Sequence, residues 1–339
     1  MPVRWYHGTF TLEGRRLRIP VARGCPPLWV RLDRDMPYPP ESVRSVTLLY
    51  DAGRLSADVT AEVSVAAYPP GAEPGPARVA GVDLGIIHPY AVAGPGGQAL
   101  LVSGRAVRAE HHLHLKDTEA RHRATARRAP KPGQRGSRRW RRYQRIVEAR
   151  HRRRVRQAQH EAARTVIGWA VARRIGTLAV GDPRGVLHLA AGRRHNRRTR
   201  DWRVGHLIAV LRDKAQQAGI TLVLTDERGT SSTCPGCRAR VPKPAGRVFS
   251  CPRCGLSGHR DLIAAANIAG RTPGGITPAV TAAGVTHRRA GNHLPGVCAA
   301  RPDPRRPHHG DARGSPGRHL PAPPTTVGRG VARRTARTS

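Results

Sequence analysis

Polar and apolar residues alternate over the first fifth of the chain, in short runs such as TFTLEG, RLRIPV and SVTLLY. Turn residues separate these runs, so residues 1–67 are predicted to form a small antiparallel β domain. Within it, the turn DAGR precedes LSADVTAEVSV and indicates a hairpin. Residues 68–78, YPPGAEPGPAR, form a linker by their composition.

The apolar pattern then changes. The run VAGVDLGII from residue 79 predicts a buried strand, and two short strands follow around GPGG. Helical spacing dominates from about 106 to 175, and later segments alternate between strand and helix: TLAVGDPRGV, a helix over 201–219, ITLVLTDE and a helix over 261–269. Three strands followed by two crossover units predict an α/β fold with a mixed sheet, in which strands one, four and five are parallel. This is the RNase H-like order.

Beyond this region the periodicity disappears. Residues 270–339 are rich in Pro, Gly, Ala, Thr and Arg, which predicts a disordered basic tail. The chain has 60 Lys and Arg against 22 Asp and Glu, a formal net charge of +38. An Arg-rich genome composition explains part of this excess, but so much charge favours a nucleic-acid partner. Without an apolar run of ~20 residues or an apolar N-terminal signal, the sequence predicts no membrane partner and a cytoplasmic, nucleoid-associated protein.

Four of the six cysteines occur in two tight pairs, CPGC and CPRC, separated by RARVPKPAGRVFS. Two such turns can close a tetrahedral four-thiolate site, whereas a redox motif has no reason to be duplicated in this way. The sequence therefore predicts one structural Zn²⁺ bound by Cys234, Cys237, Cys251 and Cys254.

Two acids stand out at element ends. Asp83 is the one charge in VAGVDLGII, where it is either a metal ligand or an acid bonded to backbone amides at a strand end. Asp261 opens the last helix, where it is either a ligand or an ordinary capping residue. Together they match a site for two Mg²⁺ ions that activates water and stabilises a leaving oxygen. His259 and Arg260 precede Asp261 and are candidates for contact with a phosphate.

In chain order, GVDLGI, the strand ending in Gly181-Asp182, GTSSTCPGC, FSCPRCG and HRDLIAAANIA resemble the TnpB family. These are OrfB-type proteins of small insertion sequences, related to type V CRISPR effectors. The resemblance covers about residues 79–269 and implies a RuvC-type nuclease domain with a zinc ribbon inserted at 230–256. It also implies that residues 1–67 are a wedge-like β domain. That region is shorter than the family's, which usually carries a helical insert there, so a truncated N-terminus is expected.

The resemblance further implies an RNA-guided DNA endonuclease. Its partners would be a guide RNA transcribed from its own locus and a double-stranded DNA target, with base pairing reading the sequence. Two alternatives remain open: a nuclease-inactive RNA-guided DNA-binding repressor, and a decayed remnant that only binds nucleic acid.

The third acid of the site is the point of departure from the family pattern. The family has a Glu followed by an Asp at the end of the fourth strand, and here Gly181 takes the place of the Glu. Asp182 points to the opposite face of the strand, so it replaces that Glu only through a bulge or register shift. The next parallel strand ends at the same edge, ~4.8 Å away, and Glu227 follows it. We therefore predict Asp83, Glu227 and Asp261 as the catalytic Mg²⁺ ligands, with Asp182 as the weaker alternative and the absence of any third acid as the remaining one.

Overall fold

The computed structural model of the chain describes residues 3–131, 133–183, 192, 201–242, 246–280, 284–289 and 332–338. Its N-terminal part consists of β-strands, as the alternating pattern predicts. Two sheets pack around one apolar core that includes Leu17, Val46 and Val59. The sheets have the orders β1 (Val3–Tyr6)–β5 (Val43–Asp51)–β6 (Arg54–Val63)–β15 (Ala332–Thr338) and β2 (Thr11–Glu13)–β3 (Arg16–Ile19)–β4 (Leu28–Arg31).

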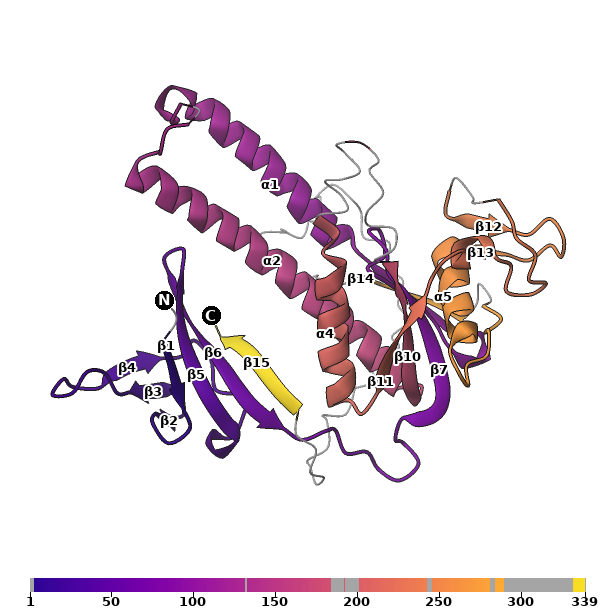
Figure 1. Ribbon diagram of the computed structural model, residues 1–339, viewed down its shortest axis with the longest axis horizontal. Helices are drawn as coiled ribbons and strands as arrows, with labels where there is room; N and C mark the ends of the chain where they lie inside the picture. Colours follow the sequence, from indigo (N-terminus) through magenta and orange to yellow (C-terminus); the bar gives the residue numbers. More distant parts are fainter. Residues whose placement is uncertain are drawn as a thin grey trace, which may run out of the picture.

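A six-stranded mixed sheet forms the second part of the molecule (Figure 1). Strands β7, β10 and β11 are parallel to one another, and β8 is antiparallel to both β7 and β9. The predicted RNase H-like order is therefore confirmed. The sheet order is β11 (Thr221–Asp226)–β10 (Ile175–Asp182)–β7 (Gly75–Asp83)–β8 (Tyr90–Ala93)–β9 (Ala99–Ser103)–β14 (Val285–Arg289).

Helices cover both faces of this sheet. α2 (Arg138–Val171) and α4 (Val204–Gln217) pack on one face, against side chains such as Val82 and Val180. α5 (Arg260–Arg271) packs on the other face, where its Ile268 contacts Val79 and Ala179. Because side chains alternate along a strand, odd-numbered residues face α5 and even-numbered ones face α2 and α4, from Val79 in β7 and from Thr177 in β10 onward.

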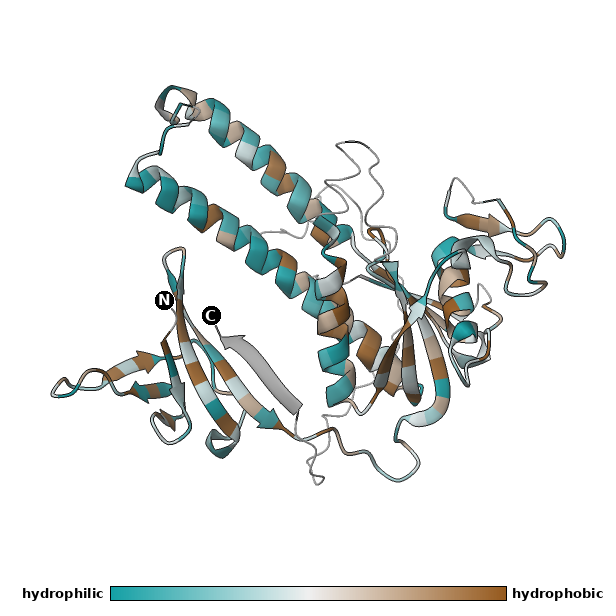
Figure 2. Cartoon of the chain, viewed as in Figure 1, coloured by the Kyte–Doolittle hydropathy of each residue, from teal (hydrophilic) through white to brown (hydrophobic). Residues whose placement is uncertain are grey.

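A long helical hairpin leads away from the sheet. α1 (Arg105–Ala124) and α2 are largely hydrophilic where they extend beyond it, and apolar residues concentrate where α2 meets the strands (Figure 2). Midway along α2, Arg152 and Arg153 lie 3.7 and 3.9 Å from the Asp51 carboxylate at the tip of the β5–β6 hairpin. The tip of the β5–β6 hairpin, from the N-terminal part of the molecule, thus lies next to α2.

Some boundaries differ from the sequence expectations. β7 begins at Gly75, inside the predicted linker, because it pairs there with Ile175 of β10. Much of the predicted tail at 270–339, including residues 290–331, lies outside the described residues. Its described part contributes two strands that the sequence pattern does not predict, β14 beside β9 and β15 beside β6. None of the described helices is long and apolar enough to cross a membrane.

Candidate functional site

Asp83 is the last residue of β7 and lies at the C-terminal edge of the central sheet, on the face that α5 covers. Burial raises the pKa of its carboxyl group well above the usual value, and the negative charges of Asp261 and Glu227 raise it further. The three acids predicted from the sequence therefore lie within electrostatic range of one another. A cluster of this kind is destabilised by its own charge and is stabilised by a cation.

Asp261 lies in the first turn of α5, where its backbone N–H is 3.3 Å from Nδ1 of His259. The side chain is buried, and both of its oxygens accept from Nη1 of Arg247, at 2.8 and 2.9 Å. Nδ1 of His88 lies 3.0 Å from Oδ2. Burial acts to raise the pKa of Asp261, but the His88 contact and the Arg247 charge outweigh it and the net pKa is lowered. Asp261 is therefore held as a carboxylate.

Glu227 follows β11 and lies above Gly181 of the neighbouring strand. A Cβ atom at position 181 would be 2.8 Å from Oε2 of Glu227, closer than real Cβ contacts come, and 3.2 Å from its Cβ, a tight contact, so the Glu227 side chain would have to shift. The parallel register pairs Gly181 with Thr225, so Glu227, two residues later, extends from the same face. The side chain of Glu227 thus occupies the volume that a side chain at 181 would need.

The side chain of Asp182 lies on the other face of the central sheet, the face that α2 and α4 cover. It has the same parity as Val180, which packs in the core under α2 and α4, and it pairs in register with Asp226. β10 has no register shift over residues 177–182 on its β11 side. The bulge that would bring Asp182 to the acid cluster is therefore not formed, and the strand parity keeps Asp182 away from Asp83.

Two contacts of Asp261 were not anticipated from the sequence. Arg247 comes from the segment between the two cysteine pairs, and His88 from the loop after β7. His88, His259 and Asp261 also offer ligand atoms within 4.8 Å of one another. The signal for His88 was its closeness to Asp83 in GIIHP, whereas nothing in the local sequence distinguishes Arg247 from the many other arginines.

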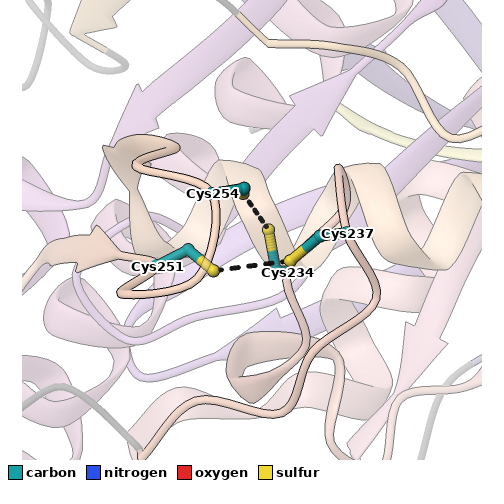
Figure 3. Close-up of side chains that lie close together, drawn as sticks. All are labelled: Cys234, Cys237, Cys251 and Cys254. Atoms are coloured by element: carbon teal, nitrogen blue, oxygen red, sulfur yellow. Dashed lines mark hydrogen bonds between the residues drawn. The ribbon is translucent and has the colours of Figure 1, made fainter.

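The four paired cysteines converge on one point (Figure 3). Sγ of Cys234 is 3.5 Å from that of Cys254, and Sγ of Cys237 is 3.6 Å from that of Cys251. These separations are too long for disulfides and close to the ~3.8 Å expected between thiolates that bind one tetrahedral Zn²⁺ at 2.3 Å. The cluster is therefore a candidate metal site of the kind that the sequence predicts.

The cysteine module is fastened to the helix that carries Asp261. Nδ2 of Asn267 donates to the carbonyl oxygens of Thr230 and Thr233, at 2.8 and 2.7 Å, just before the first cysteine pair. Phe249, from β12 (Val248–Ser250), packs with Ile263 of α5. β12 pairs with β13 (Ser257–His259), which runs directly into α5. Arg247, immediately before β12, is thereby held over the acid.

A positively charged hollow of about 640 Å³ lies between the β5–β6 hairpin and the first turns of α2. Its lining includes Arg138, Arg139 and Arg142, with which no described carboxylate forms an ion pair; Asp51 also lines it but lies nearest to Arg152 and Arg153. Tyr50, 71% exposed, stands beside them. Unpaired guanidinium groups next to an exposed aromatic ring are typical of a surface that binds nucleic acid.

Two families match consecutive parts of the chain. Residues 60–187 match the OrfB family, described as probable transposase, and residues 205–268 match the Cas12f1-like TNB domain. The second match contains the four paired cysteines, Glu227 and Asp261. No curated protein matches the chain.

Three solved structures that are similar to this chain are each 15% identical to it in sequence. A Cas12f1–sgRNA–target DNA complex aligns with a TM-score of 0.45 over 79% of this chain and 66% of that chain. A CRISPR–Cas12f ternary complex gives 0.48 over 69% and 46%. The mini-RNA-guided endonuclease Cas-phi3 gives 0.33 over 57% and 44%. The chain thus spans less than two thirds of the length of each.

Proposed function

We propose that this chain, which belongs to the TnpB-like, OrfB-type family related to type V CRISPR effectors, is an RNA-guided, Mg²⁺-dependent DNA endonuclease. The observation that carries the proposal is the position of Glu227. Its side chain fills the volume above Gly181 and acts electrostatically on Asp83, together with Asp261. Three carboxylates from three elements at one sheet edge form a ligand set suited to hard divalent cations.

Two Mg²⁺ ions held by these acids would supply an activated water and stabilise the leaving oxygen. The protein's own contribution is positioning. Arg247 keeps Asp261 ionised and places a fixed positive charge beside the acids, where the scissile phosphate would lie. His88, from the loop after β7, contacts Oδ2 of the same carboxylate and fixes its orientation.

The four cysteines are proposed to hold one structural Zn²⁺. Their role would be indirect, since the ribbon carries Arg247 and is attached to α5 through Asn267. The proposed partners are a guide RNA from the protein's own locus and a double-stranded DNA target, both of which the hollow at Arg138 and Tyr50 suits electrostatically. A protein with these partners would act on the nucleoid in the cytoplasm.

The proposal is tested by expressing the chain with RNA from its own locus, sequencing the RNA that copurifies, and assaying cleavage of a matched DNA duplex in Mg²⁺. Glu227→Gln, a nearly isosteric change that removes one ligand charge, should reduce the rate at least about a hundredfold. Asp182→Asn is the matched control and should leave the rate within a factor of about two.

Each contrary outcome has a separate meaning. Loss of cleavage in Asp182→Asn but not in Glu227→Gln would reverse the choice of third acid. Binding of the matched duplex without cleavage by the unmodified protein would make it a nuclease-inactive repressor. Absence of any copurifying RNA would exclude the guided mechanism.

A further inference from the structure

A cavity of about 520 Å³ lies beside the acid cluster, on the opposite side of the loop formed by residues 84–89. Gly85, Ile86 and Pro89 of this loop line it, together with the start of α1, the middle of α2 and the segment that leads into α4. The same loop carries His88, whose ring contacts the Asp261 carboxylate. A group bound in the cavity therefore contacts the same loop that, through His88, contacts the proposed catalytic acid Asp261.

The cavity wall combines an apolar surface with a few unsatisfied polar atoms. Val107 of α1 and Leu207 of α4 contribute apolar side chains. Gln159, only 3% exposed, has its Oε1 atom without a hydrogen-bond partner among the described residues, and the same holds for Nε1 of Trp202 and Nε2 of His111. Buried polar atoms are rarely left unpaired, so a group that supplies both donors and acceptors is expected here.

The chemistry of these walls identifies the class of ligand. A phosphate would require cations inside the cavity, but Arg108 and His112 of its lining are exposed, and the carboxylate of Asp201, which also lines it, would repel a phosphate. A flat heterocycle with N–H and carbonyl groups along one edge matches an apolar wall that holds an amide oxygen, an indole N–H and an imidazole nitrogen. The volume is ample for a nucleobase and leaves the sugar and phosphate outside the cavity.

We propose that this cavity receives one unstacked base of the DNA strand that the acids cut. The inference rests on the proposed function, since the acids define which strand passes the loop at residues 84–89. Unstacking one base costs a few kcal/mol in a duplex and less in an already separated strand. The base would fix the register of the strand so that its neighbouring phosphate lies at Asp83 and Asp261.

The test uses the full chain with its guide RNA and a matched DNA duplex. The cut site is first mapped with the unmodified protein in Mg²⁺. Duplexes are then prepared with 2-aminopurine, a fluorescent adenine analogue, at successive positions of the cut strand, and their fluorescence is compared in magnesium-free buffer. We expect a severalfold change at one position beside the cut and little at the others. An abasic site at that position should slow cleavage about tenfold, equivalent to ~1.4 kcal/mol.

Two variants assign the signal to the cavity. Val107→Phe fills it from α1 and should remove the fluorescence change and slow cleavage about tenfold, whereas Ala109→Phe, on the exposed side of the same helix, should change neither. Trp202→Ala, which enlarges the cavity, should weaken the signal and covers the case in which Val107→Phe fails to fold.

The outcomes that overturn the inference are distinct from those that overturn the function. If the duplex is cut but fluorescence is the same at every position, or the signal persists in both Val107→Phe and Trp202→Ala, no base enters the cavity. A position-specific signal from 2-aminopurine placed in the guide RNA, with none from the DNA, would show that the cavity receives a base of the RNA and would overturn the inference. If the duplex is not cut at all, the proposed function has failed and this inference fails with it.

Discussion

At the scale of single residues, the acid site is defined by volume as much as by charge. Gly181 has no side chain, and Glu227 from the next strand occupies the space above it. Ile268 of α5 closes the same space from the other side, with its Cδ1 atom 2.8 Å from a Cβ built at position 181. A side chain at 181 and the Glu227 side chain in its present position therefore exclude each other, and the end of Ile268 must also shift to admit a side chain at 181.

This exclusivity predicts the behaviour of a double variant. Glu227→Ala alone should abolish cleavage, and Gly181→Glu alone should reduce stability because its side chain clashes with Glu227 and Ile268. Combining Gly181→Glu with Glu227→Ala should recover part of the cleavage rate, since the carboxylate then reaches the same volume from β10. Cleavage assays on the three proteins measure this, with Asp182→Ala combined with Glu227→Ala as a control that should stay inactive. Equal inactivity of both double variants would contradict the exclusivity.

The pKa shift of Asp83 gives a second prediction at this scale. Burial and two neighbouring acids raise the pKa in the folded state, so the folded protein holds the proton more tightly than the unfolded chain does. The protonated Asp83 carboxyl group therefore contributes to the free energy of unfolding below the pKa that Asp83 has in the unfolded chain. This contribution is lost as the pH rises through the higher pKa that Asp83 has in the folded protein. Asp83→Asn should therefore raise the melting temperature at neutral pH by about 2–4 °C, for a gain of ~1 kcal/mol.

Thermal unfolding in magnesium-free buffer measures this gain. Adding Mg²⁺ should raise the melting temperature of the unmodified protein and leave that of Asp83→Asn nearly unchanged, because the variant lacks one ligand charge. A lower melting temperature for Asp83→Asn in magnesium-free buffer would contradict the raised pKa.

At the scale of elements, α5 determines the geometry of the site by its close approach to β7. A Cβ at Gly81 would lie 1.9 Å from the carbonyl oxygen of Ala265 and 2.6 Å from the backbone nitrogen of Ala269. Both atoms belong to the helix backbone, so no side chain can move to relieve the clash. Asp83 lies two residues further along the same face of β7, next to the start of α5 and Asp261.

Gly81→Ala should therefore displace α5 and reduce the free energy of unfolding by about 3 kcal/mol. It should also reduce cleavage, because the displacement separates Asp261 from Asp83. Gly168→Ala is the matched control: Gly168 is exposed within α2 and a Cβ there meets nothing within 4 Å, so alanine should stabilise by about 0.5–1 kcal/mol. Denaturant unfolding of both variants measures the difference, and a neutral Gly81→Ala would show that α5 is not in close contact with β7.

Most of the central fold follows from local patterns in the sequence. The apolar run ending at Asp83, the helical spacing over α2 and α4, and the order of strands specify the mixed sheet, and the paired cysteines specify their own cluster. Glu227 was predicted because alternation and parallel pairing can be counted from the sequence. Arg247 was not, since its role depends on how the ribbon folds back over α5, and one arginine among so many gives no local signal. β14 and β15 were missed because edge strands need only backbone pairing and carry no apolar periodicity.

At the scale of the whole molecule, the charge of +38 is the dominant property. Some of the 60 Lys and Arg side chains are paired with carboxylates within the fold, such as Arg44 with Glu62 and Arg247 with Asp261. Arg138, Arg139 and Arg142 are different, since they line the hollow between the two parts of the molecule without a described carboxylate partner. Their charge is available to phosphate groups.

Binding should therefore depend steeply on salt. Replacing Arg138, Arg139 and Arg142 together by Gln should reduce the slope of log affinity against log salt concentration by about 3, close to one for each phosphate that is no longer neutralised. Arg44→Gln should leave the slope nearly unchanged, because Glu62 already balances that charge. Fluorescence anisotropy with the guide RNA over a series of salt concentrations measures both slopes. An unchanged slope in the triple variant would show that the hollow does not bind phosphates.

The pairing of Gly181 with Glu227 also bears on how such proteins are detected in genomes. A search pattern that demands an acid at the end of the fourth strand would class this chain as inactive. A pattern that asks instead which carboxylate occupies that volume would retain it, with the acid supplied one strand later. A linear motif would thus miss the third carboxylate proposed for this chain, because Glu227 follows β11 but its side chain lies above the end of β10.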